Sequence, residues 1–226
     1  MVKNKKIFIA CDTNNIDKAK KIIKQTQTKK LKIGYKFGLE FINSKNGRVF
    51  ISKLKKKIIF LDLKLNDIPN TMKSAVKTLK DLKIDYLTVH ISSGLKALKT
   101  VKKVSGKIKI VGVTTLTSLD SKDLKEIGFK KSVKKLVIHQ SKLARKANLD
   151  ALVCSAHEIE YIKKIFKKEI ITPGIRLTKN SHDQKRVMTP REAIFKKKSD
   201  WLVIGRSITK GNIKNNIKSL INHLDK

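Results

Sequence analysis

The residues with the clearest chemical potential are two aspartates on either side of a lysine, in the pattern Asp62-x-Lys64-x-x-Asp67. A lysine between carboxylates stays protonated, because nearby negative charge favours the charged form of the amine. It is then a poor nucleophile and a good proton donor. Lys36 would add a second cation, which gives two lysines and two aspartates with no net charge. The pattern predicts a proton donor held in a charge network. An ion-pair network with only a structural role is the alternative.

A second group of residues, towards the C-terminus, is typical of phosphate binding. Arg206 directly follows Gly205 after an apolar run. Arginine can form two parallel hydrogen bonds with a phosphate, and glycine lets the backbone amide come close to the anion. Arg176 precedes a polar stretch, residues 177–189, that includes Gln184. A loop of this length is uncommon unless it is functional, so it predicts a lid over the phosphate. A polar surface loop without a role is the alternative.

Short apolar runs indicate the elements that must position these residues. They are rich in Ile, Val and Phe, and they recur about every 28 residues with amphipathic, lysine-rich stretches between them. Each interval can hold one strand and one helix, which predicts βαβ units and a parallel sheet. The predicted strands are 7–11, 32–37, 58–63, 86–90, 108–113, 151–154, 170–172 and 202–205.

Eight such units predict a (β/α)8 TIM barrel. No long linker rich in Pro, Gly or Ser interrupts the chain, so we expect a single domain over residues 1–226. The intervening stretches have helical spacing, as in Ile16, Ala19, Ile22 and Ile23. An open doubly wound sheet is the alternative. It would normally show a glycine-rich turn after the first strand, where this chain has none.

In a barrel, the charged residues near the ends of the predicted strands should lie at one end of the molecule. Asp12 closes the first predicted strand, Lys36 lies late in the second, and Asp62 and Lys64 lie at the end of the third. Side chains alternate along a strand, so Asp62 and Lys64 share a face with Phe60. The opposite face is wholly apolar and should meet the helices. We therefore expect both charged side chains at the barrel mouth, where sites in this fold are built.

The overall charge invites a nucleic-acid interpretation. The chain has 54 Lys plus Arg against 18 Asp plus Glu, a formal net charge of +36. Only six of the basic residues are arginines, the lysines are spread along the whole chain, and aromatic residues make up 5% of the chain. Specific readers of nucleic acid rely on arginine forks and on aromatic stacking. The composition therefore predicts a solvated lysine coat that binds polyanions only weakly and without sequence preference. A nucleic-acid-binding protein is the alternative.

Composition also argues against membrane, secreted and metal-dependent classes. No apolar run approaches the roughly 18 residues of a membrane span. The run at 7–11 is shorter than a signal sequence requires, so we expect a cytoplasmic protein. Cys11 and Cys154 have no CxxC spacing, and neither His90 nor His157 has a partner at metal-ligand spacing. The sequence predicts neither a disulfide framework nor a metal site.

Across nearly its whole length the sequence closely resembles the orotidine 5′-phosphate decarboxylase family, bacterial type. The pattern Asp-x-Lys-x-x-Asp-Ile-Pro-x-Thr at residues 62–71 is the most specific part of this resemblance. The other matching segments are residues 9–12, Lys36, 89–90, 113–118, 153–155, 172–176, 183–184 and 204–206.

The resemblance implies a dimeric barrel that converts orotidine 5′-phosphate to UMP and CO2 without a metal or organic cofactor, in pyrimidine nucleotide synthesis. It implies that Lys64 donates a proton to C6 of the pyrimidine and that Asp62 faces the substrate carboxylate. It implies that Lys36 and Asp12 hold the ribose and order the charge network.

Further roles follow from the same resemblance. Asp67 and Thr71 would reach into the neighbouring subunit's site, so that the dimer completes catalysis. Substrate binding would fall to Thr117 at the pyrimidine and, in the phosphate region, to Arg176, Gln184, Gly205 and Arg206.

One position departs from the bacterial pattern. Many bacterial relatives carry histidine where this chain has Asn66, which can hydrogen-bond but cannot titrate. The nearest alternative activity is a magnesium-dependent sugar-phosphate decarboxylase or aldolase of the same barrel group. Those relatives typically place an acidic residue on the second strand to hold the metal. The cation Lys36 at that place would repel magnesium.

Overall fold

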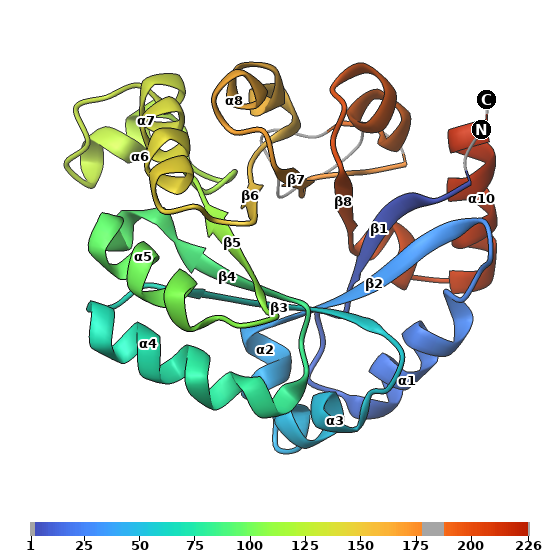
Figure 1. Ribbon diagram of the computed structural model, residues 1–226. Helices are drawn as coiled ribbons and strands as arrows, with labels where there is room; N and C mark the ends of the chain where they lie inside the picture. The colour runs from blue at the N-terminus through green and yellow to red at the C-terminus, as the bar shows by residue number, and fades with distance from the viewer. Residues whose placement is uncertain (1–2, 178–187, 226) are drawn as a thin grey trace.

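The computed structural model describes residues 3–177 and 188–225 of the chain. Within these residues, eight parallel strands pair in sequence order and close into a barrel, with β1 beside β8. Helices surround the strands (Figure 1). The strands are β1 Lys5–Ala10, β2 Leu31–Gly38, β3 Ile58–Leu65, β4 Tyr86–His90, β5 Lys109–Val113, β6 Ala151–Val153, β7 Glu169–Thr172 and β8 Trp201–Ile204.

Helical segments follow the strands and cover the outside of the barrel. The α-helices are α1 Ile16–Gln25, α2 Leu39–Ile42, α3 Gly47–Lys53, α4 Pro69–Thr78, α5 Gly94–Val104, α6 Ser121–Glu126, α7 Val133–Lys146, α8 Ile159–Ile165, α9 Arg206–Thr209 and α10 Ile213–Asp225. Short 3-10 turns are η1 Leu79–Leu82, η2 Ile91–Ser93 and η3 Ala156–Glu158, and a π-helical turn is η4 Glu192–Lys196.

Local sequence explains where the helices begin. The side chain of Asn15 caps α1 by accepting a hydrogen bond from the amide of Lys18 at 2.9 Å. Asp120 and Asp123 form a reciprocal capping box at the start of α6. Pro69 occupies the first turn of α4, where its missing amide hydrogen costs nothing.

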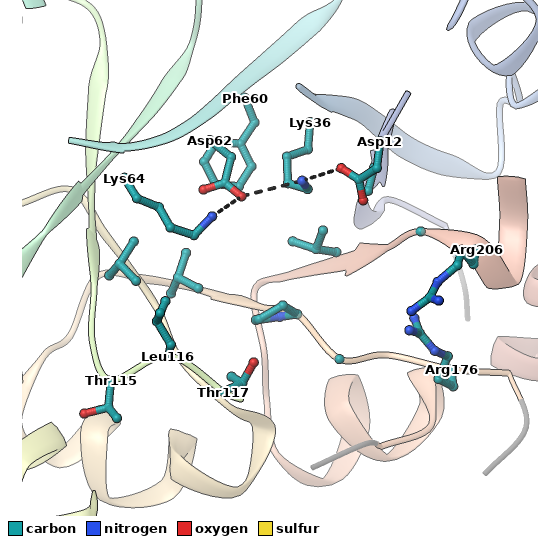
Figure 2. A pocket seen from close by; sticks show the side chains of 17 residues that line it. Asp12, Lys36, Phe60, Asp62, Lys64, Thr115, Leu116, Thr117, Arg176 and Arg206 are labelled. Atoms are coloured by element: carbon teal, nitrogen blue, oxygen red, sulfur yellow. Dashed lines mark hydrogen bonds and ion pairs between the residues drawn. The ribbon is translucent and has the colours of Figure 1, made fainter. Parts of the chain in front are cut away.

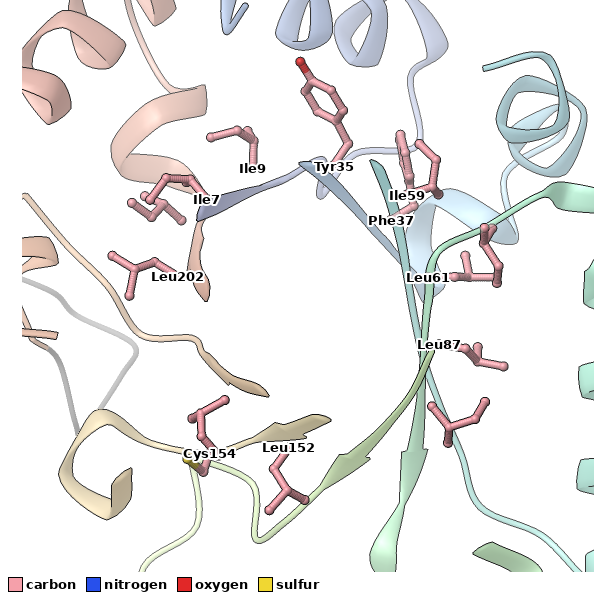
Figure 3. Packing of buried hydrophobic residues seen from close by; sticks show 14 of the residues in the cluster. Ile7, Ile9, Tyr35, Phe37, Ile59, Leu61, Leu87, Leu152, Cys154 and Leu202 are labelled. Atoms are coloured by element: carbon pink, nitrogen blue, oxygen red, sulfur yellow. The ribbon is translucent and has the colours of Figure 1, made fainter. Parts of the chain in front are cut away.

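Two apolar layers hold the fold together. The larger layer lies between the strands and the helices, and Figure 3 shows side chains such as Ile9, Phe37 and Leu87 pointing away from the barrel axis. The smaller layer fills the barrel interior and consists of Phe8, Ala10, Phe60, Tyr86, Val111, Ala151, Ile171, Trp201 and Val203. Burial on both faces explains why the strands have continuous apolar runs.

Aromatic rings and one carboxylate close the amino end of the barrel. Phe8 stacks on Trp201 with ring centroids 3.9 Å apart. The carboxylate of Glu169 accepts hydrogen bonds from Lys6 at 3.0 Å, Lys109 at 2.9 Å and the Tyr86 hydroxyl at 3.0 Å. We call Lys6, Tyr86, Lys109, Glu169 and Trp201 the floor cluster. All five residues lie at or next to the first residue of a strand, so the opposite end remains open for a site.

The structure confirms the predicted barrel. Every predicted strand overlaps an observed one, with both ends within two residues. The open doubly wound alternative is wrong, because β1 pairs with β8 and leaves no sheet edge. The spacing analysis did not find the short helices α2, α3 and α6, which lie in loops after strands. Among the described residues, none of the helices has the length and apolar character needed to cross a membrane.

Candidate active site

Four charged side chains meet at the carboxyl ends of the first three strands, as the sequence predicts (Figure 2). The Nζ atom of Lys64 lies 2.9 Å from Oδ2 of Asp62. The Nζ atom of Lys36 lies 2.9 Å from Oδ1 of Asp12 and 3.5 Å from Oδ2 of Asp62. The four residues form an alternating chain of charges, Asp12–Lys36–Asp62–Lys64, which we call the charge network.

The inner members of the charge network are strongly buried. The side chains of Lys36 and Asp62 are 12% and 13% exposed, whereas that of Lys64 is 35% exposed and reaches the cavity. Burial alone would lower the pKa of Lys36, but the carboxylates of Asp62 and Asp12 outweigh it and raise this pKa. Burial alone would raise the pKa of Asp62, but Lys36 and Lys64 outweigh it and lower this pKa. Both groups are therefore charged at neutral pH.

The backbone of β3 departs from regular strand geometry at the charge network. Leu61 pairs with Leu87 of β4, but the next pair is Leu65 with Val89, so the register shifts between them. Lys64 has φ +51°, a left-handed conformation that is uncommon outside glycine. The Lys64 amide donates to the hydroxyl of Thr88 at 2.8 Å. Asp62 and Lys64 both line the cavity, as side-chain alternation predicts, but they do so on a bulged strand.

The charge network forms one wall of a cavity of about 340 Å³. Thr115, Leu116 and Thr117, which follow β5, contribute another wall. At the far end from Lys64, the side chains of Arg176 and Arg206 point toward one another (Figure 2). A polar cavity with a proton donor at one end and two arginines at the other suits a small anionic molecule with its reacting carbon remote from its phosphate.

The phosphate end comes from the loops after β7 and β8. Gly205 precedes α9, lines the cavity, and brings Arg206 to its edge. Arg176 follows β7, and its amide bonds the carbonyl of Met188 at 3.1 Å, so the two ends of the predicted lid lie together. Gln184 and most of that lid lie outside the described residues.

Two predicted site residues do not line the cavity. Asp67 is exposed, and its carboxylate accepts a hydrogen bond from the amide of Ile68 at 2.6 Å. Thr71 is exposed on α4. Both side chains are therefore accessible to a second chain. Neighbouring Ile68 is a large apolar side chain that is 66% exposed.

Two residues near the charge network did not emerge as site residues from sequence spacing. Thr88 on β4 is fully buried and donates to Oδ1 of Asp62 at 3.0 Å. His90, two residues later, is half-buried, and burial together with the charge of Lys64 lowers its pKa, so the imidazole is neutral at pH 7. Only the alternation Tyr86, Thr88, His90 could have indicated that these side chains face the barrel interior. The described residues contain no cluster of three or more His, Cys, Asp or Glu side chains arranged to hold a metal ion.

Comparison with known proteins identifies the family. Residues 5–216 match the model of the orotidine 5′-phosphate decarboxylase / HUMPS family. The chain belongs to this family. An orotidine 5′-phosphate decarboxylase from Wolbachia of Brugia malayi is 42% identical over 222 residues, which is 95% of this chain and 96% of the relative. The enzyme of that name from Prochlorococcus marinus (strain MIT 9515) is 40% identical, and the match spans 94% of this chain and 93% of the relative.

Solved structures of the decarboxylase family share the barrel. The orotidine 5′-phosphate decarboxylase of Lactobacillus acidophilus matches with a TM-score of 0.84 and 27% identity, covering 99% of this chain and 100% of its own. The orotidine 5′-monophosphate decarboxylase of Methanocaldococcus jannaschii, solved with the inhibitor BMP, matches with a TM-score of 0.77 and 25% identity. It covers 98% of this chain and 99% of its own.

Proposed function

We propose that the cavity at the barrel mouth decarboxylates orotidine 5′-phosphate to UMP and CO2, a carboxy-lyase step of pyrimidine nucleotide synthesis. The observation that carries the proposal is the ammonium group of Lys64, held 2.9 Å from Asp62 at one end of a cavity that has two arginines at its other end. A pyrimidine nucleotide has this same layout, with its reacting carbon on the base and its phosphate on the sugar.

The charge network accounts for the chemical step. The bond from C6 to the carboxylate breaks, the electron pair stays on C6, and CO2 leaves. A carbanion at C6 is very basic, so the protonated Lys64 beside it supplies both electrostatic stabilisation and the proton that forms the C6–H bond. Lys64 then recovers a proton from solvent. Asp62 faces the departing carboxylate, and its negative charge opposes the bound carboxylate more than the neutral CO2.

The remaining predicted residues bind the substrate. Lys36 and Asp12 contact the ribose and hold the charge network in place. Thr117 contacts the pyrimidine. The phosphate end consists of Arg176, Gly205 and Arg206, together with Gln184 from the segment outside the described residues. Binding energy from this remote phosphate can be used at the reacting carbon, which gives the lid a purpose.

We also propose that the active form is a homodimer of single-domain chains, residues 1–226. Asp67 and Thr71 would then enter the partner's cavity. Their exposure and the exposed apolar side chain of Ile68 between them support this arrangement. The proposed enzyme is cytoplasmic and works without a metal or organic cofactor.

The test is to mix the purified protein with orotidine 5′-phosphate and follow the loss of its ultraviolet absorbance. We expect turnover by the wild type and none above background by Lys64→Ala. No turnover by the wild type, or equal activity of the variant, would overturn the proposal.

Excess EDTA separates this reaction from the magnesium-dependent chemistry of related barrels. Lys36 lies between the carboxylates of Asp12 and Asp62, where a divalent cation would otherwise be attracted. We therefore expect EDTA to leave turnover unchanged. Loss of activity that magnesium restores would favour the metal-dependent alternative.

A further inference from the structure

Thr88 lies opposite the irregular part of β3. Between the pairs Leu61–Leu87 and Leu65–Val89, three residues of β3, numbers 62–64, oppose Thr88 alone on β4. Such bulges interrupt the ladder of backbone hydrogen bonds and re-aim side chains, and they occur near active sites. The bulge therefore needs a group on β4 that replaces the missing ladder bonds.

The hydroxyl of Thr88 is that group. It accepts a hydrogen bond from the Lys64 amide at 2.8 Å and donates one to Oδ1 of Asp62 at 3.0 Å. A hydroxyl has one hydrogen to donate. An ionised carboxylate can only accept, so the direction of both bonds is fixed. One oxygen atom thus joins the backbone of Lys64 to the side chain of Asp62.

The two oxygen atoms of the Asp62 carboxylate have different partners. Oδ1 faces Thr88, while Oδ2 lies 2.9 Å from Lys64 and 3.5 Å from Lys36. Thr88 is fully buried, so water cannot replace its hydroxyl without a rearrangement. The left-handed φ of Lys64, +51°, is a strained conformation that persists only where surrounding contacts hold it.

We propose that Thr88 is a positioning residue for decarboxylation, because its hydroxyl holds the bulge of β3 and thereby sets where the Lys64 ammonium and the Asp62 carboxylate lie. This inference rests on the proposed function. Thr88 is fully buried and does not line the cavity, so it acts through its two neighbours. Without the hydroxyl, the Lys64 amide and Asp62 Oδ1 each lose a buried partner, and the strained backbone can relax.

Thr88→Val tests this inference, because valine keeps the shape of the buried side chain and replaces the hydroxyl with a methyl group. Misplacing a catalytic group by 1 Å can cost on the order of 100-fold in rate, so we expect kcat to fall by about that factor. The phosphate end is untouched, so KM and the dissociation constant for UMP should stay within about threefold of wild type. Thr88→Ser restores the hydroxyl and should recover most of kcat.

The pH profile provides a readout that general loosening of the fold would not give. Loss of a donor to the Asp62 carboxylate raises the pKa of this group. The acid limb of kcat in Thr88→Val should therefore move to higher pH, whereas the limb in Thr88→Ser should stay in place.

Thr26→Val is the matched control. Thr26 is also fully buried, but its hydroxyl donates to the carbonyl of Ile22 at the C-terminal end of α1, and Thr26 does not line the cavity. This variant should lose stability without a change in kcat. Thermal unfolding of every variant shows whether it is folded. If Thr88→Val does not fold, Thr88→Ala removes the same hydroxyl without placing a methyl group against Asp62.

The outcomes separate the two proposals. An active wild type with an equally active Thr88→Val would overturn the role of Thr88 and leave the proposed function standing. A fall in kcat that Thr88→Ser does not recover, or one matched by Thr26→Val, would also overturn it. An inactive wild type would overturn the proposed function itself.

Discussion

Single side chains at the barrel mouth have separate tasks at its two ends. At one end, Lys64 and Asp62 face the position where we place the reacting carbon, and the cations Lys36 and Lys64 lower the pKa of Asp62 in spite of its burial. At the other end, Arg176 and Arg206 face the position where we place the phosphate. Substitutions at the two ends should therefore have different kinetic signatures.

Arg206→Ala should raise KM for orotidine 5′-phosphate far more than it disturbs folding. Hydrogen bonds to a charged group contribute about 1.5–3 kcal/mol, so the loss in kcat/KM should be at least about tenfold. Arg206 lies at the edge of the cavity, outside the two apolar layers, so the unfolding temperature should barely change. Steady-state kinetics and thermal unfolding give the two readouts. Arg145→Ala, at an exposed arginine in the last turn of α7, is the control. Wholesale unfolding of Arg206→Ala would contradict the prediction.

Strands and helices divide the barrel into a reactive end and a closed end. The strand ends carry the charge network at the mouth, whereas the strand starts carry the floor cluster around Glu169. Burial would raise the pKa of Glu169, but hydrogen bonds from Lys109, Lys6 and Tyr86 outweigh it and lower the pKa to about 2. The floor cluster therefore stabilises the fold without facing the cavity.

Glu169→Gln should destabilise the protein by about 1–3 kcal/mol at pH 7 and leave kcat unchanged. The folded pKa of about 2 lies below the ordinary value of 4.5. The stabilisation from ionised Glu169 is therefore complete above pH 4.5 and is lost as the pH falls towards 2. Denaturant unfolding of both proteins at several pH values checks this. Glu160→Gln is the control, because Glu160 is 74% exposed and its ion pair with Lys197 spans 3.7 Å. A stability difference that persists unchanged down to pH 2 would rule the explanation out.

The sequence could predict the elements and most of the charge network, but not the contacts between distant strands. Apolar runs located every strand, because strands buried on both faces leave a continuous signal. Asp62 and Lys64 follow from alternation within one strand. Thr88 could not be predicted, because its role depends on a bulge in another strand. Glu169 and Lys6 are 163 residues apart, and no local pattern reports their contact.

The proposed roles of Asp67 and Thr71 require a dimer in which each active site contains residues from both chains. Both residues are exposed and lie outside the cavity of their own chain. A two-fold homodimer has one interface, which is formed by the same surface of both chains, so each chain would complete the other's site. The distribution of site residues between chains can be tested directly by mixing variants.

Mixing Lys64→Ala with Asp67→Asn, each inactive alone, should restore activity. A mixed dimer has one cavity with both native residues, and half of the randomly reassembled dimers are mixed. The recovered rate should therefore be about a quarter of the wild-type rate. Lys64→Ala mixed with Asp62→Asn is the control, because both residues belong to the same cavity and no mixed dimer has an intact site. Recovery in the control, or none in the test mixture, would contradict the proposed dimer.

The net charge of +36 predicts a second property of the whole molecule. Exposed lysines displace the counterions that surround the phosphates of DNA. The protein should therefore bind DNA weakly and without sequence preference, and the binding should weaken steeply as the salt concentration rises. Electrophoretic shift assays on unrelated duplexes over a range of salt concentrations measure this. A complex that survives physiological salt and prefers one sequence would show a specific nucleic-acid function instead.

Trp201 gives the molecule a built-in optical probe. It is the only tryptophan of the chain, it is 1% exposed, and it stacks on Phe8 at the closed end of the barrel. Its fluorescence therefore reports the integrity of the barrel floor and of no other region. The emission of Trp201 should shift to longer wavelength when the barrel unfolds. Nucleotide binding at the mouth should leave this emission nearly unchanged. Unfolding can thus be followed by this fluorescence without interference from ligand binding at the other end of the barrel.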